Sequence, residues 1–256
     1  MRITLRLLLL PSVLFIFVLS ACGSQQQPTH AQAQAPAPRF SCTSTSVTSF
    51  LSHINRQNTA GHNSAQAAST QHMHMGPHMK MTSFQQPTSG DIAYANAIMQ
   101  IARQCLAKYT DYKLALQDGY RIFEPDVPQD IYHFASLQNF VEAQTKFNPL
   151  HPTALLYNKL DNGYQFVGIM FSAPTNYTEN QLNERFPLGI APWHLHVNIC
   201  LPAGELQHVL FPGNSQFGLT GSITTKAGCT KVGGRFVPSM FGWMVHISPF
   251  GLNVNP

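Results

Sequence analysis

The sequence predicts an α+β fold, in which one domain has an antiparallel sheet with helices packed to one side and follows a flexible tether. Three observations support this prediction. Apolar residues from Asp91 to Tyr109 recur at helical spacing, whereas after Leu150 they alternate as in half-buried strands. Asp161-Asn162-Gly163 lies between two alternating runs and is typical of a hairpin turn. The polar stretches before Asp91 show neither period, so the domain is expected over residues 91–256.

The first 21 residues are predicted to be a signal peptide. Arg2 and Arg6 give it a positive start, and the apolar run Leu7–Leu19 is too short for a permanent membrane-spanning helix. The run leads into Leu-Ser-Ala-Cys, which resembles the lipobox of bacterial lipoproteins and implies cleavage before Cys22 and its diacylation, including palmitate. The alternative is an ordinary secretory signal cut near Ala21. Both alternatives export the protein, and lipidation would anchor it to a bacterial membrane on the periplasmic face.

Residues 22–90 are predicted to form a largely disordered tether. Gly23–Arg39 consists mainly of Gln, Ala and Pro without an apolar period, and Asn58–Gly90 is rich in Gln, Ser, His and Met. A short helix is expected between these stretches at Ser46–Gln57, because its apolar residues share one helical face.

Within the domain, each element is predicted from its apolar period and from the residues at its ends. The first helix follows the capping residues Ser89-Gly90-Asp91 and runs to about Tyr109. Shorter helices are expected at Asp111–Gln117, Thr178–Arg185 and Thr225–Val232. The expected strands are Thr153–Leu160 and Tyr164–Ala173, which form the hairpin, and then Trp193–Leu201 and Phe241–Ser248.

The cysteines after Cys22 are predicted to form disulfides. None of them has the two-residue spacing of a zinc or redox motif, and an exported chain meets an oxidising environment. The favoured pairs are Cys42 with Cys105 and Cys200 with Cys229. The alternative is buried free thiols.

A tract rich in histidine and methionine is a candidate metal site. Residues 71–82 read QHMHMGPHMKMT and place His72, His74 and His78 among four methionines. Imidazole nitrogen and thioether sulfur together suit copper, because Cu(I) prefers sulfur and Cu(II) prefers nitrogen. The alternative is a disordered linker whose composition carries no function.

A second candidate set lies in the predicted strands. Alternation places His194 and His196 on one face of a strand, about 6.5 to 7 Å apart, and places Met244 and His246 on one face of another. His133 follows an acidic loop and is the third candidate. Each histidine taken singly is more simply explained as a hydrogen-bonded core or surface residue, whereas one metal ion would satisfy several of them together.

The order of several short motifs resembles a group of uncharacterised exported bacterial proteins. The matching segments are Lys108-Tyr109-Thr110-Asp111, Ala115, Asp118-Gly119-Tyr120, Tyr132-His133-Phe134, Asn148-Pro149, Pro152, Ala154-Leu155-Leu156-Tyr157, His194-Leu195-His196-Val197 and, in the closest members, Trp243-Met244-Val245-His246. The resemblance covers roughly Ala102–Val197. It implies that His133, His194, His196 and His246 belong to one site, and it implies no activity.

Composition and motifs narrow the function. The formal net charge is +4, only 10% of residues are charged, and no Lys/Arg cluster is present in the sequence, which argues against a nucleic-acid partner. We therefore expect an exported, membrane-anchored lipoprotein that binds copper or, second, zinc. One alternative is a metal-dependent hydrolase or oxidoreductase, with Glu124, Asp126 or Asp130 as base. Another alternative is a structural envelope lipoprotein without a ligand.

Overall fold

The computed structural model describes residues 40–54, 76–83, 85–203 and 216–250. The predicted signal peptide, the lipidation site Cys22 and the first part of the tether lie outside the described residues. His72 and His74 of the histidine- and methionine-rich tract also lie outside them, whereas His78 lies within.

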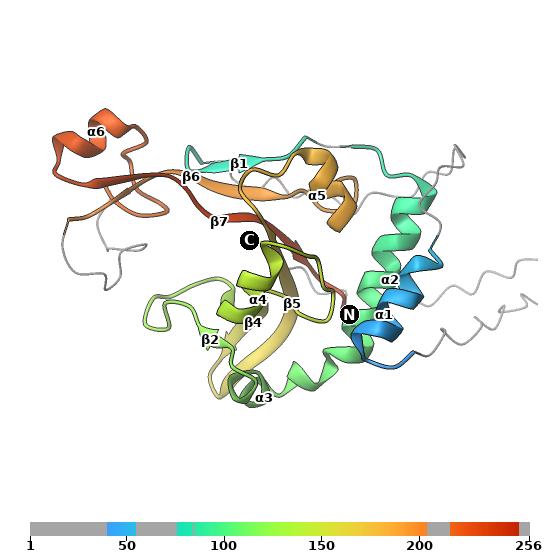
Figure 1. Cartoon of the computed structure of the whole chain (residues 1–256). Helices are drawn as coiled ribbons and strands as arrows, with labels where there is room; N and C mark the ends of the chain where they lie inside the picture. The colour runs from blue at the N-terminus through green and yellow to red at the C-terminus, as the bar shows by residue number, and fades with distance from the viewer. Residues whose placement is uncertain (1–39, 55–75, 84, 204–215, 251–256) are drawn as a thin grey trace, which may run out of the picture. The chain divides into compact units, whose positions relative to one another are not determined.

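The centre of the fold is a seven-stranded sheet in which all neighbouring strands are antiparallel, with the order β1-β6-β7-β5-β4-β3-β2 (Figure 1). The strands are β1 (Met79–Met81), β2 (Arg121–Ile122), β3 (Tyr132–Ala135), β4 (Ala154–Leu160), β5 (Gly163–Ala173), β6 (His194–Leu201) and β7 (Arg235–Ile247). This arrangement confirms the predicted α+β class with an antiparallel sheet.

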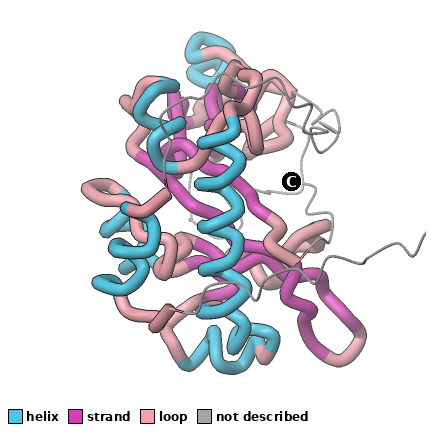
Figure 2. Tube along the Cα trace, turned by 90° about the vertical axis from the view of Figure 1, so that its right-hand side faces the viewer, coloured by secondary structure: helices cyan, strands magenta, loops and turns pink. Residues whose placement is uncertain are grey.

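Helices complete the fold and cover the sheet. They are α1 (Ser44–Ser52), α2 (Ser89–Cys105), the 3₁₀-helix η1 (Ala107–Thr110), α3 (Tyr112–Gln117), α4 (Leu137–Ala143), α5 (Glu179–Arg185) and α6 (Lys226–Lys231). The long helix α2 runs across the strands (Figure 2). The short helix α6 lies at the end of β6 and β7 that is remote from α2 (Figure 1).

Helix α2 supplies much of the main hydrophobic core. It begins after Thr88, which forms a capping box with Asp91, and such caps stabilise a helix by about 1 kcal/mol. Its fully buried Ile98 and Ala102 belong to the same apolar cluster as Trp243 and other residues from the central strands. The opposite face of the sheet is therefore left for other contacts, because side chains alternate between the two faces of a strand.

The predicted hairpin is present as β4 and β5. Leu160 pairs with Gly163 at its tip, and Gly163 has a φ of +133°. A Cβ atom at this position would lie 2.9 Å from Cε1 of Tyr112, so both the backbone conformation and the neighbouring ring require glycine.

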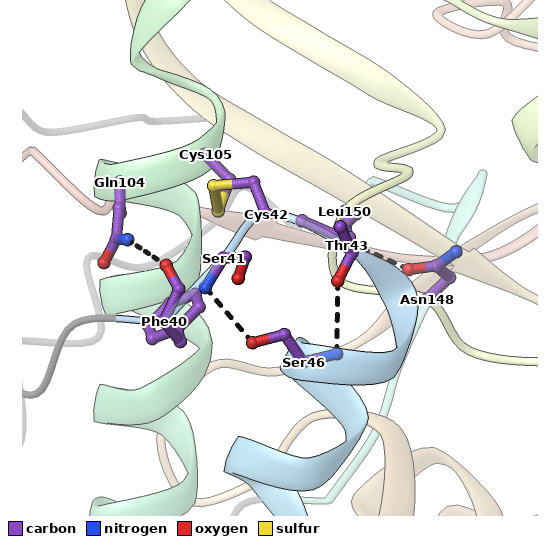
Figure 3. The surroundings of a disulfide bond; sticks show 9 residues. All are labelled: Phe40, Ser41, Cys42, Thr43, Ser46, Gln104, Cys105, Asn148 and Leu150. Carbon is purple, nitrogen blue, oxygen red and sulfur yellow. Dashed lines mark hydrogen bonds between the residues drawn. A yellow bond between two sulfur atoms is a disulfide. The ribbon is translucent and has the colours of Figure 1, made fainter.

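Both predicted disulfides are present. Cys42–Cys105 joins the segment before α1 to the last residue of α2 (Figure 3), and Cys200–Cys229 joins β6 to α6. Beside the first disulfide, the Gln104 side chain donates a hydrogen bond of 2.6 Å to the carbonyl oxygen of Phe40. Two disulfides indicate an oxidising, extracytoplasmic environment. No helix among the described residues is long and apolar enough to cross a membrane.

The structure differs from the sequence-based expectation at the start of the domain. Met79–Met81 lies in the stretch expected to be loose, but it forms the edge strand β1, in which Met79 pairs with His196 and Met81 with His194. The Thr82 hydroxyl also accepts a hydrogen bond of 3.0 Å from the backbone N–H of Trp193. The compact unit thus includes residues well before the expected boundary at Asp91.

Candidate functional site

Four histidines lie together on the sheet face opposite α2. They are His133 on β3, His194 and His196 on β6, and His246 on β7, and we call them the histidine cluster. All four line one cleft with a volume of about 1040 Å³. The cluster combines the residues that the sequence analysis grouped, although whether they bind a metal stays a prediction.

The sheet brings His133 and His246 together from strands that are not neighbours. Strands β4 and β5 lie between β3 and β7. At about 4.8 Å per strand, β3 and β7 would be about 14 Å apart in a flat sheet. The two imidazoles nevertheless meet above the intervening strands, where Ala154 and Gly168 are the smallest residues of this face by their pairing register.

A sharp irregularity in β7 shapes the wall of the cleft. His194 of β6 pairs with Met244, whereas His196 pairs with Met240, so β7 contains extra residues at this point. Two of them, Phe241 and Gly242, have φ values of +64° and +71°. A positive φ at a bulky residue such as phenylalanine costs about 1–3 kcal/mol, and such strain concentrates at functional sites.

The spacing of the rings matches that of imidazoles around one metal ion. Two nitrogens at about 2.05 Å from a tetrahedral ion lie about 3.3 Å apart, and the centroids of their rings lie about 5 Å apart. The Nε2 atoms of His133 and His246 are 3.3 Å apart, and their ring centroids are 5.1 Å apart. The ring centroid of His194 is 5.0 Å from that of His246 and 5.7 Å from that of His196.

The hydrogen bonds of the cluster are incomplete. The two Nε2 atoms of His133 and His246 can share one proton, and His133 also has a hydrogen bond to the backbone of Ile131. The Nδ1 atom of His246 is buried and has no hydrogen-bond partner within the described part of the chain. A buried polar atom without a partner costs about 1–3 kcal/mol, so this atom needs an explanation.

The cluster is uncharged at neutral pH. Burial lowers the pKa of each histidine, and neighbouring histidines lower it further. The pKa is about 4 for His133, about 3 for His194 and about 4 for His196. Burial also lowers the pKa of His246 well below its ordinary value. Neutral imidazole is the form that binds a metal ion, so no proton has to be released to solvent at pH 7.

Methionines accompany the histidines on the same face. Met244, which the sequence analysis named, pairs with His194 on one side and with Ser172 on the other. Met79 and Met170 also line the cleft. Met170 was missed because it lies within a long apolar run, in which the sequence contains no sign that one residue faces a site.

His78 has a different role from the other predicted ligands. It is buried at the edge of the cleft, with Nε2 at 2.6 Å from the carbonyl oxygen of Gly221 and Nδ1 at 3.3 Å from that of Val197. Both ring nitrogens therefore face backbone oxygens. These contacts connect the segment before β1 to β6 and to the loop that contains Gly221.

The acidic residues considered as bases are only partly at the site. Asp130 lines the cleft, but Glu124 and Asp126 do not. Asp130 is exposed and lies in the loop that leads into β3. The cleft wall also contains Phe241, whose ring centroid is 6.2 Å from that of His196; the sequence analysis expected a strand there, not a kink.

Among the described residues, no three or more His, Cys, Asp or Glu side chains present their donor atoms to one point as they stand. His133 and His246 already face each other through Nε2, whereas His194 and His196 are near by ring distance only. Binding of an ion by the whole cluster would thus require rotation of side chains.

The chain matches no protein-family profile, no curated protein and no solved structure. The resemblance to exported bacterial proteins therefore stays a prediction.

Proposed function

We propose that the protein is an exported, lipid-anchored protein whose histidine cluster binds a transition metal ion, copper first and zinc second. The observation that carries this proposal is the pair of Nε2 atoms of His133 and His246, which are separated by 3.3 Å, the distance between two ligands of one tetrahedral ion. An ion between them would take the place of the shared proton, which would move to the Nδ1 atom of its own ring.

The chemistry of the remaining residues supports the same proposal. His194 lies within ring contact of His246 and becomes a third nitrogen ligand when its ring turns toward the pair. Imidazole nitrogens suit both copper and zinc, whereas the thioether of Met244 favours copper in its reduced form. Calcium and magnesium are disfavoured because they prefer oxygen ligands, and Asp130 is the only carboxylate among the described residues that line the cleft.

The open cleft favours a second candidate function, a metal-dependent enzyme. A catalytic metal site keeps one position free for water or substrate, and the histidine cluster opens into a space far larger than an ion needs. Asp130 would then be the nearest candidate for a general base on the cleft wall. Turnover of a substrate that requires the metal would distinguish this function from simple binding.

The test is metal binding by the mature chain, purified without a metal-affinity tag. Isothermal titration with Zn²⁺ and with Cu²⁺ should give one tight site in the parent. His133→Ala and His246→Ala should each weaken it by more than about 100-fold, because even residues that only orient metal ligands contribute about 10- to 100-fold. His53→Ala is the matched control, since His53 is exposed at the end of α1. Equal binding by all four proteins would refute the site.

A further inference from the structure

The cleft is much larger than a metal site requires. Its volume of about 1040 Å³ is at the upper end of the range for pockets that hold drug-sized ligands. Its walls are mainly apolar, with contributions from Ile122, Phe123, Ile131, Leu219 and Phe241. Such walls favour an apolar molecule, because water against them gains no hydrogen bonds.

The mouth of the cleft also has exposed apolar side chains. Leu137, at the start of α4, lines the cleft and is 78% exposed, and Phe140 of the same helix lines it as well. Large apolar side chains that gather at the entrance of a cavity are typical of sites that bind apolar ligands.

The charges indicate the head group of such a ligand. Arg121 and Asp130 are the only charged residues among the described residues that line the cleft. Nη1 of Arg121 donates hydrogen bonds to the carbonyl oxygens of Leu116 and Tyr120. A divalent ion held by neutral imidazoles therefore keeps nearly its full positive charge, which an anionic ligand would compensate.

We propose that the cleft binds an anionic amphiphile, whose apolar body lies along the cleft walls and whose head group binds the metal ion held by the histidine cluster. This inference rests on the proposed function, because the head group needs the ion. It adds the chemical class of the ligand, a molecule with an alkyl or aromatic body and one carboxylate-like end. Association involves no covalent step.

The experiment compares straight-chain carboxylates of increasing length. Isothermal titration of the zinc-loaded full mature chain should show weak binding of acetate and affinity that rises by about fourfold per methylene from butyrate to octanoate, because each methylene leaves water. The metal-free protein should bind octanoate at least tenfold more weakly. Octanol, which has the same body without the charge, should also bind at least tenfold more weakly.

Two variants change the cleft without removing a histidine. Ala135→Phe adds a ring on the cleft-facing side of β3, next to His133. This variant should lose octanoate binding and keep zinc binding. Its control is Ala107→Phe, which adds the same ring on the exposed surface of η1. Leu137→Gln changes only an exposed side chain and should weaken octanoate severalfold but leave acetate unchanged. Leu160→Gln, also at an exposed leucine, should change neither.

The outcomes separate this inference from the function on which it rests. Zinc binding with equal affinity for acetate and octanoate would overturn the inference and leave the metal site standing. Octanoate binding of equal strength with and without zinc would overturn the role of the head group. Absence of binding of both Zn²⁺ and Cu²⁺ would overturn both proposals.

Discussion

Replacing His246 with leucine should stabilise the metal-free protein and destabilise the metal-loaded protein relative to the parent. In the metal-free state the change removes the unpaired Nδ1 atom, whose burial costs about 1–3 kcal/mol. It also removes the hydrogen bond to His133, a loss of about 0.5–1.5 kcal/mol, because His133 is only partly buried and lines the cleft, where water can replace its lost partner. The first effect is larger, so the free energy of unfolding should rise by about 1 kcal/mol.

With metal present the order should reverse. At an ion concentration of 100 times the dissociation constant, binding stabilises the parent by about 2.7 kcal/mol, and the leucine variant loses most of this gain. Urea unfolding of both proteins, in chelator and in excess Zn²⁺, measures the two differences. The reasoning is refuted when His246→Leu loses more than about 1 kcal/mol in chelator, because the ring would then be a stabilising part of the core.

His78→Leu is the matched control for this experiment. His78 is also a buried histidine of the same cleft, but its Nε2 is 2.6 Å from the carbonyl oxygen of Gly221. Loss of this hydrogen bond leaves a backbone oxygen without its partner, so His78→Leu should cost about 1–3 kcal/mol with or without metal. A difference between the two leucine variants in chelator therefore reports on hydrogen bonding and not on size.

Three further predictions concern other parts of the chain. Cys22→Ser should release the exported protein from the membrane into the soluble fraction, as fractionation would show. Gly242→Ala should cost about 3 kcal/mol or more in urea unfolding, because its Cβ would lie 2.3 Å from a backbone oxygen; Gly233→Ala, with a similar φ and open space, should cost only about 1 kcal/mol. Burial raises the pKa of Glu142, but hydrogen bonds from Lys146 and its neighbours outweigh burial and hold the pKa at about 2. Glu142→Gln should therefore lose about 1–2 kcal/mol above about pH 5, a difference that disappears as the pH falls toward 2.

The elements that the sequence predicts correctly have local signals. The helix expected at Thr225–Val232 appears as α6, because the Thr225 hydroxyl caps its first turn. The helix expected at Thr178–Arg185 appears as α5, where Thr178 forms a capping box. In both cases the capping threonine directly precedes the helix that it caps. The disulfides were predictable for another reason, since the number of cysteines limits the possible pairings and the predicted signal peptide implies an oxidising environment.

Some elements were missed because they depend on distant partners, whereas α4 was missed although the Ser136 side chain caps it locally. Strand β1 has only three residues and gains its ladder from β6, more than a hundred residues later in the chain. The same holds for the site: His133 and His246 are separated by 113 positions and by two strands. The sequence placed His194 beside His196 by alternation, but it could not show which other histidines lie above the same face, because the register and the kink at Phe241 decide this.

Several exceptions to ordinary folding rules lie along the cleft, although Trp243, whose buried Nε1 has no partner among the described residues, and Glu124 and Asn198, which have positive φ, do not line it. Phe241 has a positive φ, and His246 has an unpaired buried nitrogen. His194 is buried away from water, which lowers its pKa. If His246→Leu stabilises the metal-free protein as predicted above, stability alone does not explain this histidine. A metal ion satisfies the nitrogens of several histidines at once, and an amphiphile would cover the apolar walls above them. The strained backbone at Phe241 and the buried histidines would then contribute to the binding of a ligand, whereas an ion at Nε2 would leave Nδ1 of His246 without a partner. The core on the other side of the sheet provides the stability that these exceptions require.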